Sequence, residues 1–318
     1  MEKRYKPPFN MTEPITNLVI EIGELTGKIA ENDRLSANPK LRRENRIRTI
    51  HSSLAIEQNS LTLDQVTDVI DGKRVLAPPQ DIKEVKNAYE AYEQLAKMDP
   101  YSVEDLLTAH SYMMESLIDE AGRFRTKGVG VFDGDRLVHA GTPPQYVPGL
   151  VKELFQWLAE SEIHPLIKSC IFHYEFEFIH PFKDGNGRMG RLWHSLILQK
   201  WQPFFAWLPM ETLIHENQEA YYKALNQANH EGESTAFVQF MLSVICASLR
   251  ELADEQCNKN TDQKAIAILR EKPEITLSML ADELHITKRQ AERIVAELKR
   301  TGAVERVGAR KNGRWKVL

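Results

Sequence analysis

His180-Pro-Phe-Lys-Asp-Gly-Asn-Gly-Arg-Met-Gly-Arg191 is the stretch that decides how this chain folds and what it does. Apolar residues recur at helical spacing on both sides of it, which predicts helices over 165–179 and 187–200. The glycines interrupt that pattern, because glycine adopts backbone angles that other residues avoid and lets a ligand approach the main chain closely. We therefore expect a tight turn that leads directly into the first turn of a helix.

The residue types in this run suit the chemistry of phosphate groups. A helix that begins after the glycines presents unpaired N–H groups and the positive end of its dipole, which together bind anions. Arg188 and Arg191 share one helix face, and two guanidinium groups suit a polyphosphate better than a single phosphate. Asp184 can hold Mg²⁺ that bridges phosphate oxygens, and His180 can act as a general base near neutral pH. These groups predict a site for phosphoryl or nucleotidyl transfer.

The run resembles the signature of the Fic family, His-Pro-Phe-x-(Asp/Glu)-Gly-Asn-Gly-Arg-x-x-Arg, and all nine specified positions match. The resemblance implies a protein adenylyltransferase, in which His180 takes a proton from a Ser, Thr or Tyr hydroxyl of a target protein or of the chain itself. That oxygen then attacks the α-phosphorus of ATP and expels pyrophosphate. The residues that the resemblance assigns to ATP and Mg²⁺ are Asp184 for the metal, Gly185, Gly187 and the side chain of Asn186 for the α- and β-phosphates, Arg188 for the β-phosphate and Arg191 for the γ-phosphate.

A second family element lies N-terminal to the signature. Residues 51–60 resemble the inhibitory helix, with the pattern (Ser/Thr)-x-x-x-Glu-(Gly/Asn), which Ser53 and Glu57 fit. In the family this glutamate pairs with the second arginine, here Arg191, and so removes the anchor of the γ-phosphate. Gln58 departs from the pattern, and it changes how the helix ends because glutamine adopts the left-handed backbone poorly. The alternative is that Glu57 is a solvated helix residue.

Two more segments extend the resemblance. A hairpin predicted over 128–139 by β-forming residues on both sides of Asp133-Gly134 resembles the flap, whose edge pairs with an extended target segment. The segment 221–229 resembles the one that closes over adenine, with Tyr222 packed on the base and Asn229 hydrogen-bonded to it. An ordinary hairpin and core tyrosines are the alternatives, and Arg125 is expected to be structural. The flap residues so assigned are Val129, Gly130, Val131, Leu137 and Val138. The histidines expected to be structural are His51, His110, His173, His194 and His215.

Composition limits the class of protein. A chain of 318 residues has room for roughly two domains. No apolar run approaches the ~20 residues that span a bilayer, and the first residues lack the apolar segment of a secretory signal. The three cysteines show no metal-ligand spacing. We therefore expect a cytoplasmic protein with no membrane partner.

The helical pattern predominates before residue 257, so the predicted fold is mainly α. It is a Fic-type helical bundle with a small β-hairpin flap, followed by a C-terminal winged helix-turn-helix domain. We expect an N-terminal helical region over 1–100 that carries the inhibitory helix at about 45–60, and a catalytic core over 101–253. A polar linker over 254–261 and the winged domain over 262–318 follow.

The C-terminal segment is the basic part of the chain. Over 262–318 it has 13 Lys and Arg against 8 Asp and Glu, a net of +5, so the remainder carries −9. It resembles a winged helix-turn-helix, with a turn at 285–287, a third helix over 288–300 and a wing at 308–313, which suggests DNA as a partner. The alternative is a scaffold for protein contacts. Basic residues on or near the third helix and wing include Lys288, Arg289, Arg293, Arg300, Lys311 and Arg314.

Several functions stay open beside autoinhibited AMP transfer. The same site could remove AMP, with Glu57 positioning a water on the modified residue, or it could transfer another phosphate-containing group. A DNA-binding regulator whose Fic body only senses nucleotide is the rival from another class, although sensing needs no base such as His180. The sequence leaves the target, the modified residue and the oligomeric state open, a homodimer included.

Overall fold

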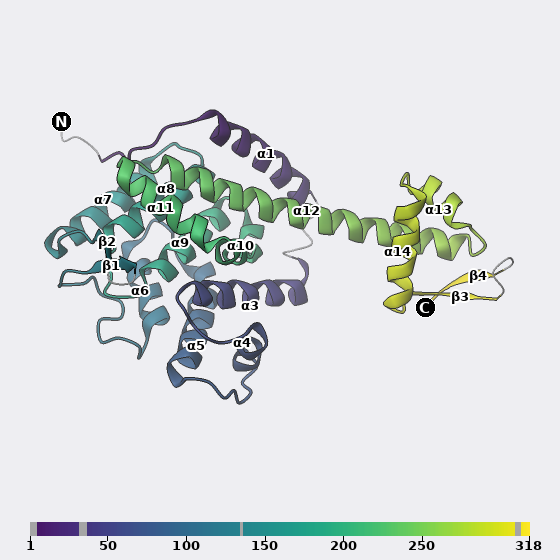
Figure 1. Cartoon of the computed structure of the whole chain (residues 1–318), viewed down its shortest axis with the longest axis horizontal. Coiled ribbons are helices and arrows are strands. Elements are labelled where there is room, and N and C mark those ends of the chain that lie inside the picture. The colour runs from purple at the N-terminus through teal and green to yellow at the C-terminus, as the bar shows by residue number, and fades with distance from the viewer. Residues whose placement is uncertain (1–4, 32–36, 134–135, 309–312) are drawn as a thin grey trace. The chain divides into compact units, whose positions relative to one another are not determined.

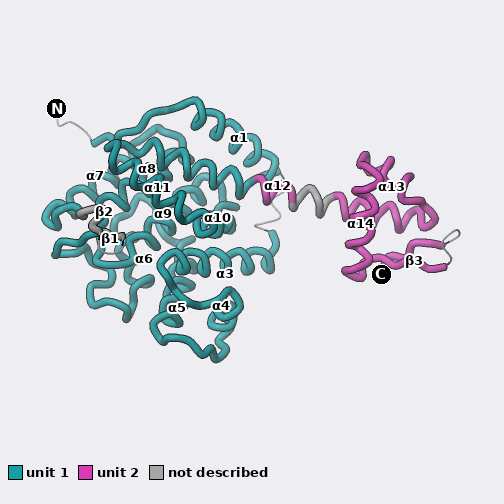
Figure 2. Tube along the Cα trace, in the orientation of Figure 1, with its two compact units in different colours: residues 1–249 teal, residues 250–318 magenta. Residues whose placement is uncertain are grey.

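The computed structural model describes the chain except residues 1–4, 32–36, 134–135 and 309–312, and over 131–140 and 255–260 it describes the backbone only. The chain divides into two compact units, residues 1–249 and 250–318 (Figure 2). Among the described residues, unit 1 is helical except for one two-stranded hairpin, and unit 2 combines helices with a second two-stranded sheet (Figure 1). The predicted mainly helical fold with a small hairpin is therefore confirmed.

The first helices of unit 1 begin where local capping chemistry predicts. The Thr12 hydroxyl accepts from the Ile15 N–H, and the Ser102 hydroxyl accepts from the Asp105 N–H, so each satisfies an N–H group that has no partner within its helix. Thr62 and Gln65 form a capping box, and it starts a short helix that the sequence analysis did not predict. These elements are α1 (Glu13–Ala30), α3 (Pro39–Ile56), α4 (Leu63–Ile70), α5 (Pro79–Gln94), η1 (Leu95–Lys97) and α6 (Val103–Met114).

The predicted hairpin is present as two antiparallel strands. β1 (Gly130–Asp133) pairs with β2 (Arg136–Ala140), and the register shifts between Val131 and Phe132. Gly134, in the predicted turn, lies outside the described residues. The helices that follow are η2 (Pro144–Tyr146), α7 (Val147–Glu160), α8 (Pro165–Ile179), α9 (Asn186–Trp201), η3 (Pro203–Trp207), α10 (Met210–Glu216) and α11 (Gln218–Glu231), of which α10 was not predicted.

Helices α8 and α9 form the centre of unit 1 (Figure 1). α8 is buried on nearly all sides, which is typical of a helix surrounded by other elements. Phe172 and Phe176 of α8 and Trp193 of α9 are fully buried. In the turn that joins the two helices, Phe182, Gly185 and Asn186 are buried in this core, whereas Lys183 and Asp184 are exposed.

The expected linker over 254–261 is wrong in its local structure. α12 (Thr235–Glu271) runs through it as one helix, because the segment contains no proline or glycine to end a helix. Its residues 235–254 have a mean hydropathy of 1.5, enough by length and composition alone to cross a membrane. However, 56% of this segment is buried in the structure, as in a core helix.

Unit 2 has a small core of its own. α13 (Leu277–Glu283) and α14 (Lys288–Arg300) are joined by a turn in which His285 has a φ of 54°, and Thr287 caps α14. β3 (Val304–Val307) pairs antiparallel with β4 (Arg314–Val317). The Trp315 indole is buried in this core, and its N–H donates to the Ile275 carbonyl at 2.9 Å. The predicted turn at 285–287 and the predicted helix over 288–300 are therefore present, while Lys311 of the predicted wing lies outside the described residues.

Candidate active site

The turn between α8 and α9 reverses the chain through two left-handed residues. His180 has a φ of 52° and caps α8, with its N–H bonded to the Phe176 carbonyl at 2.9 Å. Gly185 has a φ of 81°, and a Cβ there would lie 2.7 Å from Sδ of Met114. Glycine at 185 is therefore required both by the backbone angle and by the space. The first turn of α9 begins directly afterwards, as the sequence predicts.

The Asn186 side chain braces this turn from inside. Its Oδ1 accepts from the Phe182 N–H at 2.8 Å, and its Nδ2 donates to the Phe182 carbonyl at 2.9 Å. A side-chain amide is complementary to one peptide group, so both of its polar atoms are used. The expected phosphate contact of this side chain stays a prediction, and only the second hydrogen of Nδ2 is left to make it.

His110 supports the turn from α6. Its Nδ1 accepts from the Gly122 N–H at 2.9 Å, which leaves Nε2 to donate to the Asp184 carbonyl at 3.1 Å. Its ring stacks on Phe182 with centroids 3.6 Å apart. Burial lowers the pKa of His110 to about 4, so the ring is neutral near pH 7. The expectation that His110 is structural agrees with these contacts.

Arg125 ties the catalytic turn to the base of the hairpin. Its Nε donates to the His180 carbonyl at 2.6 Å, and its Nη1 donates to the Lys127 carbonyl at 3.0 Å. Its Nη2 also donates to the carbonyls of Thr142 and Ile179. Because one rigid guanidinium group bonds to both segments, their relative position is fixed. The expected structural role of Arg125 agrees with this geometry.

Arg191 is buried and held by the end of α3. Its Nη2 lies 2.7 Å from Oε1 of Glu57 and donates to the Ser53 carbonyl at 3.0 Å, and its Nε donates to the Ser53 hydroxyl at 3.1 Å. Burial lowers the pKa of Arg191, but the charge and hydrogen bond of Glu57 together with Tyr221 and Glu177 outweigh it, so the net pKa is raised. The structure thus brings Arg191 to Ser53 and Glu57, from which it is separated by 138 and 134 residues in sequence.

Gly187 gives the Glu57 carboxyl group room beside the first turn of α9. A Cβ at residue 187 would lie 2.4 Å from Oε1 of Glu57 and 3.0 Å from Nη1 of Arg191. Any larger residue would therefore push this carboxyl group out. The same space, next to N–H groups and a guanidinium group, is suited to an anionic oxygen of a ligand.

Arg188 and Asp184 form the other side of the turn. Arg188 is buried, and its Nη2 donates to Oδ1 of Asp184 at 3.3 Å. Its Nη1 lies 3.6 Å from a carboxylate oxygen of Glu84, yet Nε and Nη1 have no hydrogen-bond partner among the described residues. A buried guanidinium group with unused donors is expected to meet an anion. The Asp184 side chain is 56% exposed, so its carboxylate is accessible to a cation.

Glu57, His180, Gly187 and Arg191 border a cavity of about 170 Å³, whereas the other expected phosphate and metal contacts do not line it. Those others are Asp184, Gly185, Asn186 and Arg188. Ligand sites commonly measure ~300–1,000 Å³, so this cavity, with Glu57 in its wall, is smaller than a nucleotide site usually is. The cavity is lined by Glu57, Glu177, Phe178, His180, Gly187, Arg191, Tyr221, Tyr222, Leu225, Asn226 and Asn229. Five of these residues were not predicted as site residues from the sequence: Glu177, Phe178, Tyr221, Leu225 and Asn226. The spacing 222, 225, 226 and 229 places one face of α11 along the cavity and could have revealed the last two.

Asn229 reaches this cavity with its amide oriented. Its Oδ1 accepts from the Tyr174 hydroxyl at 3.2 Å, which leaves Nδ2 as the donor toward a ligand. Tyr222 is 42% exposed in the same cavity. Both positions fit the expected contacts with a base, and those contacts stay a prediction.

Of the residues expected to form the flap, Val129 and Gly130 are described in full. The Gly141 N–H donates to the Val129 carbonyl at 3.0 Å, and Gly130 starts β1. For Val131, Leu137 and Val138 the structure describes the backbone alone. Target docking on this hairpin therefore stays a prediction.

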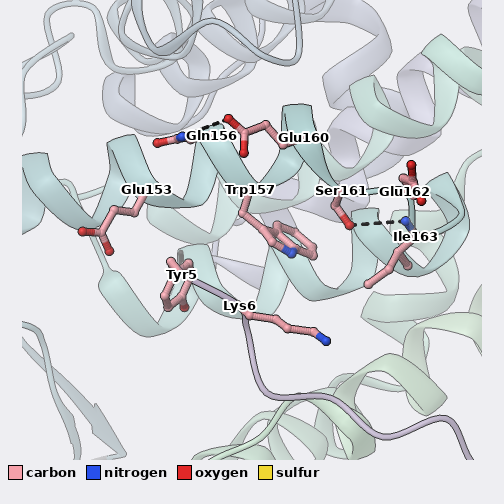
Figure 3. Close-up of a pocket in the computed structure, with 9 residues that line it drawn as sticks. All are labelled: Tyr5, Lys6, Glu153, Gln156, Trp157, Glu160, Ser161, Glu162 and Ile163. Carbon is pink, nitrogen blue, oxygen red and sulfur yellow. Dashed lines mark hydrogen bonds between the residues drawn. The ribbon is translucent and has the colours of Figure 1, made fainter. Parts of the chain in front are cut away.

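A larger cavity, about 610 Å³, lies elsewhere, between Tyr5, Lys6 and one side of α7 (Figure 3). Its lining includes Trp157 and three glutamates. It contains neither the histidine nor the arginines of the turn, and no helix N-terminus with glycines borders it. We therefore assign the chemistry to the smaller cavity, because its groups match a phosphate ligand.

A left-handed histidine, a glycine-shaped helix start and two buried arginines are features that suit the phosphates of a ligand. Comparison with known proteins identifies the family. Residues 100–198 match the Fic/DOC family. A Fic family protein from Desulfovibrio desulfuricans G20 has a solved structure with 43% identity and a TM-score of 0.78, covering 99% of this chain and 98% of that one. The chain belongs to the Fic family, as the sequence predicts.

Curated relatives are named for their activity. The protein adenylyltransferase Fic from Nematostella vectensis is 29% identical over 204 residues, or 60% of this chain and 45% of the relative. A probable protein adenylyltransferase from Aquifex aeolicus (strain VF5) is 34% identical over 185 residues, or 55% of this chain and 52% of the relative. The chain thus spans about half the length of these relatives.

Proposed function

We propose that this chain is a protein adenylyltransferase, which transfers AMP from ATP to a Ser, Thr or Tyr hydroxyl of a target protein or of itself. The observation that carries the proposal is that His180, Gly187 and Arg191 border one cavity. A general base, a helix start and a buried cation thus converge on a single ligand. The names of the curated relatives support the same activity.

The residues divide the work of the reaction. His180 accepts the proton of the target hydroxyl, and the oxygen forms a bond to the α-phosphorus as the bond to pyrophosphate breaks. The N–H groups at the start of α9, with Arg188 and Arg191, bind the phosphates and the negative charge that the reaction builds on them. Asp184, exposed beside these donors, would hold Mg²⁺, which neutralises phosphate charge when bound.

Glu57 is proposed to inhibit this reaction. Its carboxylate occupies the space beside Gly187 and uses the guanidinium group that would bind the γ-phosphate. A carboxylate and a phosphate compete for the same donors of Arg191. Withdrawal of Glu57 is therefore expected to admit ATP in the reactive position.

Labelled ATP tests both points. We expect Glu57→Gly to incorporate more label into protein than the wild type, from α-labelled ATP and not from γ-labelled ATP. Label from the γ position would identify a kinase and contradict the proposal, and so would no label from either position in any variant. Loss of label from a modified protein on adding wild-type chain would identify AMP removal instead.

For unit 2 we infer a winged helix-turn-helix domain with DNA as its partner. The order α13, turn, α14, β3, β4 and the net charge of +5 over residues 262–318 support it. Arg314 and Lys316 instead lie 2.9 Å from carboxylates of their own unit, which reduces the charge that DNA would meet. Affinity that falls steeply with added salt would support phosphate contacts, and affinity independent of salt would exclude them. A cytoplasmic location and a homodimer stay predictions.

A further inference from the structure

A second carboxyl group lies beside the catalytic histidine. Glu177 precedes His180 by one turn of α8, and its Oε2 is 3.9 Å from Nδ1 of His180. The backbone carbonyl of Glu177 is 3.3 Å from the same nitrogen. Residue 177 is outside the nine-position signature, yet its side chain lines the cavity with His180.

The neighbouring helix leaves space for this carboxyl group. A Cβ at Gly190 would lie 2.8 Å from Oε1 of Glu177 and 2.9 Å from Cδ2 of His173. Oε1 is buried and has no hydrogen-bond partner among the described residues. Oε1 faces Nε2 of His173 at 3.9 Å, whereas Oε2 is the oxygen that faces His180. The carboxyl group is thus kept in place although Oε1 makes no hydrogen bond, which is costly for a buried polar atom.

We propose that Glu177 is a positioning residue for His180. Nδ1 faces both the carbonyl and the carboxyl group of Glu177, which places the ring proton on Nδ1 and leaves Nε2 to receive the proton of the target hydroxyl. When Nε2 is protonated, the ring becomes a cation that an ionised Glu177 stabilises, as the acidic member of a catalytic triad does. This inference rests on the proposed transfer of AMP.

The surroundings of Glu177 link it to the inhibitory glutamate. Burial raises the pKa of Glu177 to about 8, the charge of Arg191 lowers it, and the charge of Glu57 raises it. Withdrawal of Glu57 therefore lowers the pKa of Glu177 and favours its ionised form. The same movement frees the donors of Arg191 for ATP. The titratable groups that face Glu177 from α3, α8, α9 and α11 are Glu57, His173, His180, Arg191, Tyr221 and Tyr222.

The first test is spectroscopic and needs no turnover. In the full chain with ¹⁵N-labelled histidine, NMR reports the tautomer and the pKa of each ring, and His180→Ala identifies the signals of His180. In the Glu57→Gly background we expect the Nδ1–H tautomer. We also expect Glu177→Gln to lower the pKa of His180 by about one unit, which corresponds to about tenfold in the protonation equilibrium. An unchanged pKa, or the Nε2–H tautomer, would overturn the proposal.

The second test uses the pH dependence of AMP transfer in the same background. Glu177→Gln is expected to reduce kcat by about tenfold or more, to leave KM for ATP unchanged, and to move the acid limb of the profile to lower pH. Glu177→Asp is expected to restore part of kcat. The control is Glu175→Gln, a buried glutamate of the same helix that contacts Tyr5 instead. A profile for Glu177→Gln that matches this control would contradict the positioning role.

The two tests separate the two proposals. If Glu57→Gly transfers no AMP at any pH, the proposed function fails, and the NMR measurement still decides the role of Glu177. If Glu177→Gln does not fold, Glu177→Asp decides it. A shorter side chain is expected to shift the pKa of His180 in the same direction, and no shift would refute the inference.

Discussion

The charged groups of unit 1 and unit 2 differ in burial and in the distance of their partners along the chain. Arg191 is buried and bonds to Ser53 and Glu57, more than 130 residues away. In unit 2, Arg314 is 72% exposed and pairs with Glu274, which is equally exposed. A buried charge is costly unless it is paired, so a buried pair such as Arg191 with Glu57 points to a functional site. An exposed ion pair contributes little to stability and carries no such information. The burial of charged groups, more than the number of cations, therefore distinguishes unit 1, which contains the candidate site, from unit 2.

Acid should lower the stability of unit 1, because this unit buries histidines that are neutral in the folded chain. Burial lowers the pKa of His110 and of His194 to about 4 each, below the ordinary value of 6.5. The unfolded chain then binds more protons than the folded chain between pH 6.5 and 4, so stability falls as the pH falls through this window. The loss approaches about 3 kcal/mol for each histidine below pH 4. Thermal unfolding at stepped pH measures it.

A variant that lacks one of these histidines tests whether they cause the loss of stability in acid. His194→Leu removes one of these rings and should reduce the loss of stability between pH 6.5 and 4. An acid loss of the same size in this variant would show that other groups control the transition.

Removal of Glu57 should have the next largest effect. In Glu57→Gly the donors of Arg191 lose a charged hydrogen-bond partner worth about 1.5–3 kcal/mol, and ATP can then take its place. We expect ATP with Mg²⁺ to bind about 10- to 100-fold more tightly than to the wild type. Calorimetric titration measures this change. Glu44→Gly at the exposed start of α3 is the control, and equal affinity in wild type and Glu57→Gly would contradict the competition.

The end of α3 should respond more modestly. The Asn59 N–H bonds to the Leu54 carbonyl and the Gln58 N–H bonds to the Ala55 carbonyl, a Schellman motif with Gln58 at a φ of 67°. A left-handed glutamine costs more than a glycine there, so Gln58→Gly should stabilise the fold by about 1 kcal/mol. Chemical denaturation measures the difference, and a destabilised variant would show that the Gln58 side chain makes a favourable contact.

The exposed pair of unit 2 should matter least. Arg314→Gln is expected to change the free energy of unfolding by less than about 1 kcal/mol, because exposed ion pairs gain little in water. A larger loss of unfolding free energy in chemical denaturation would show that this exposed pair does contribute to stability and would contradict the difference drawn between the two units.

The sequence predicted the local parts of the site and missed what depends on the rest of the fold. The His180 turn was readable because its twelve residues follow one another and each type has a physical reason to be there. The short helices α4 and α10 were missed, since a helix of seven or eight residues depends on its packing more than on its pattern. The two hydrogen bonds between the Asn186 side chain and the Phe182 backbone could not be predicted from the sequence, because they depend on the shape of the turn. Glu177 was missed because its role depends on the bend at His180.

The central claim is that His180 removes the proton from the target while the glycine-lined turn and the arginines hold ATP. The most direct test compares Glu57→Gly with Glu57→Gly/His180→Ala, measuring incorporation of α-labelled ATP and affinity for ATP. We predict that the rate falls by about 10²–10⁴-fold while affinity is retained. Equal rates in the two variants would contradict the account.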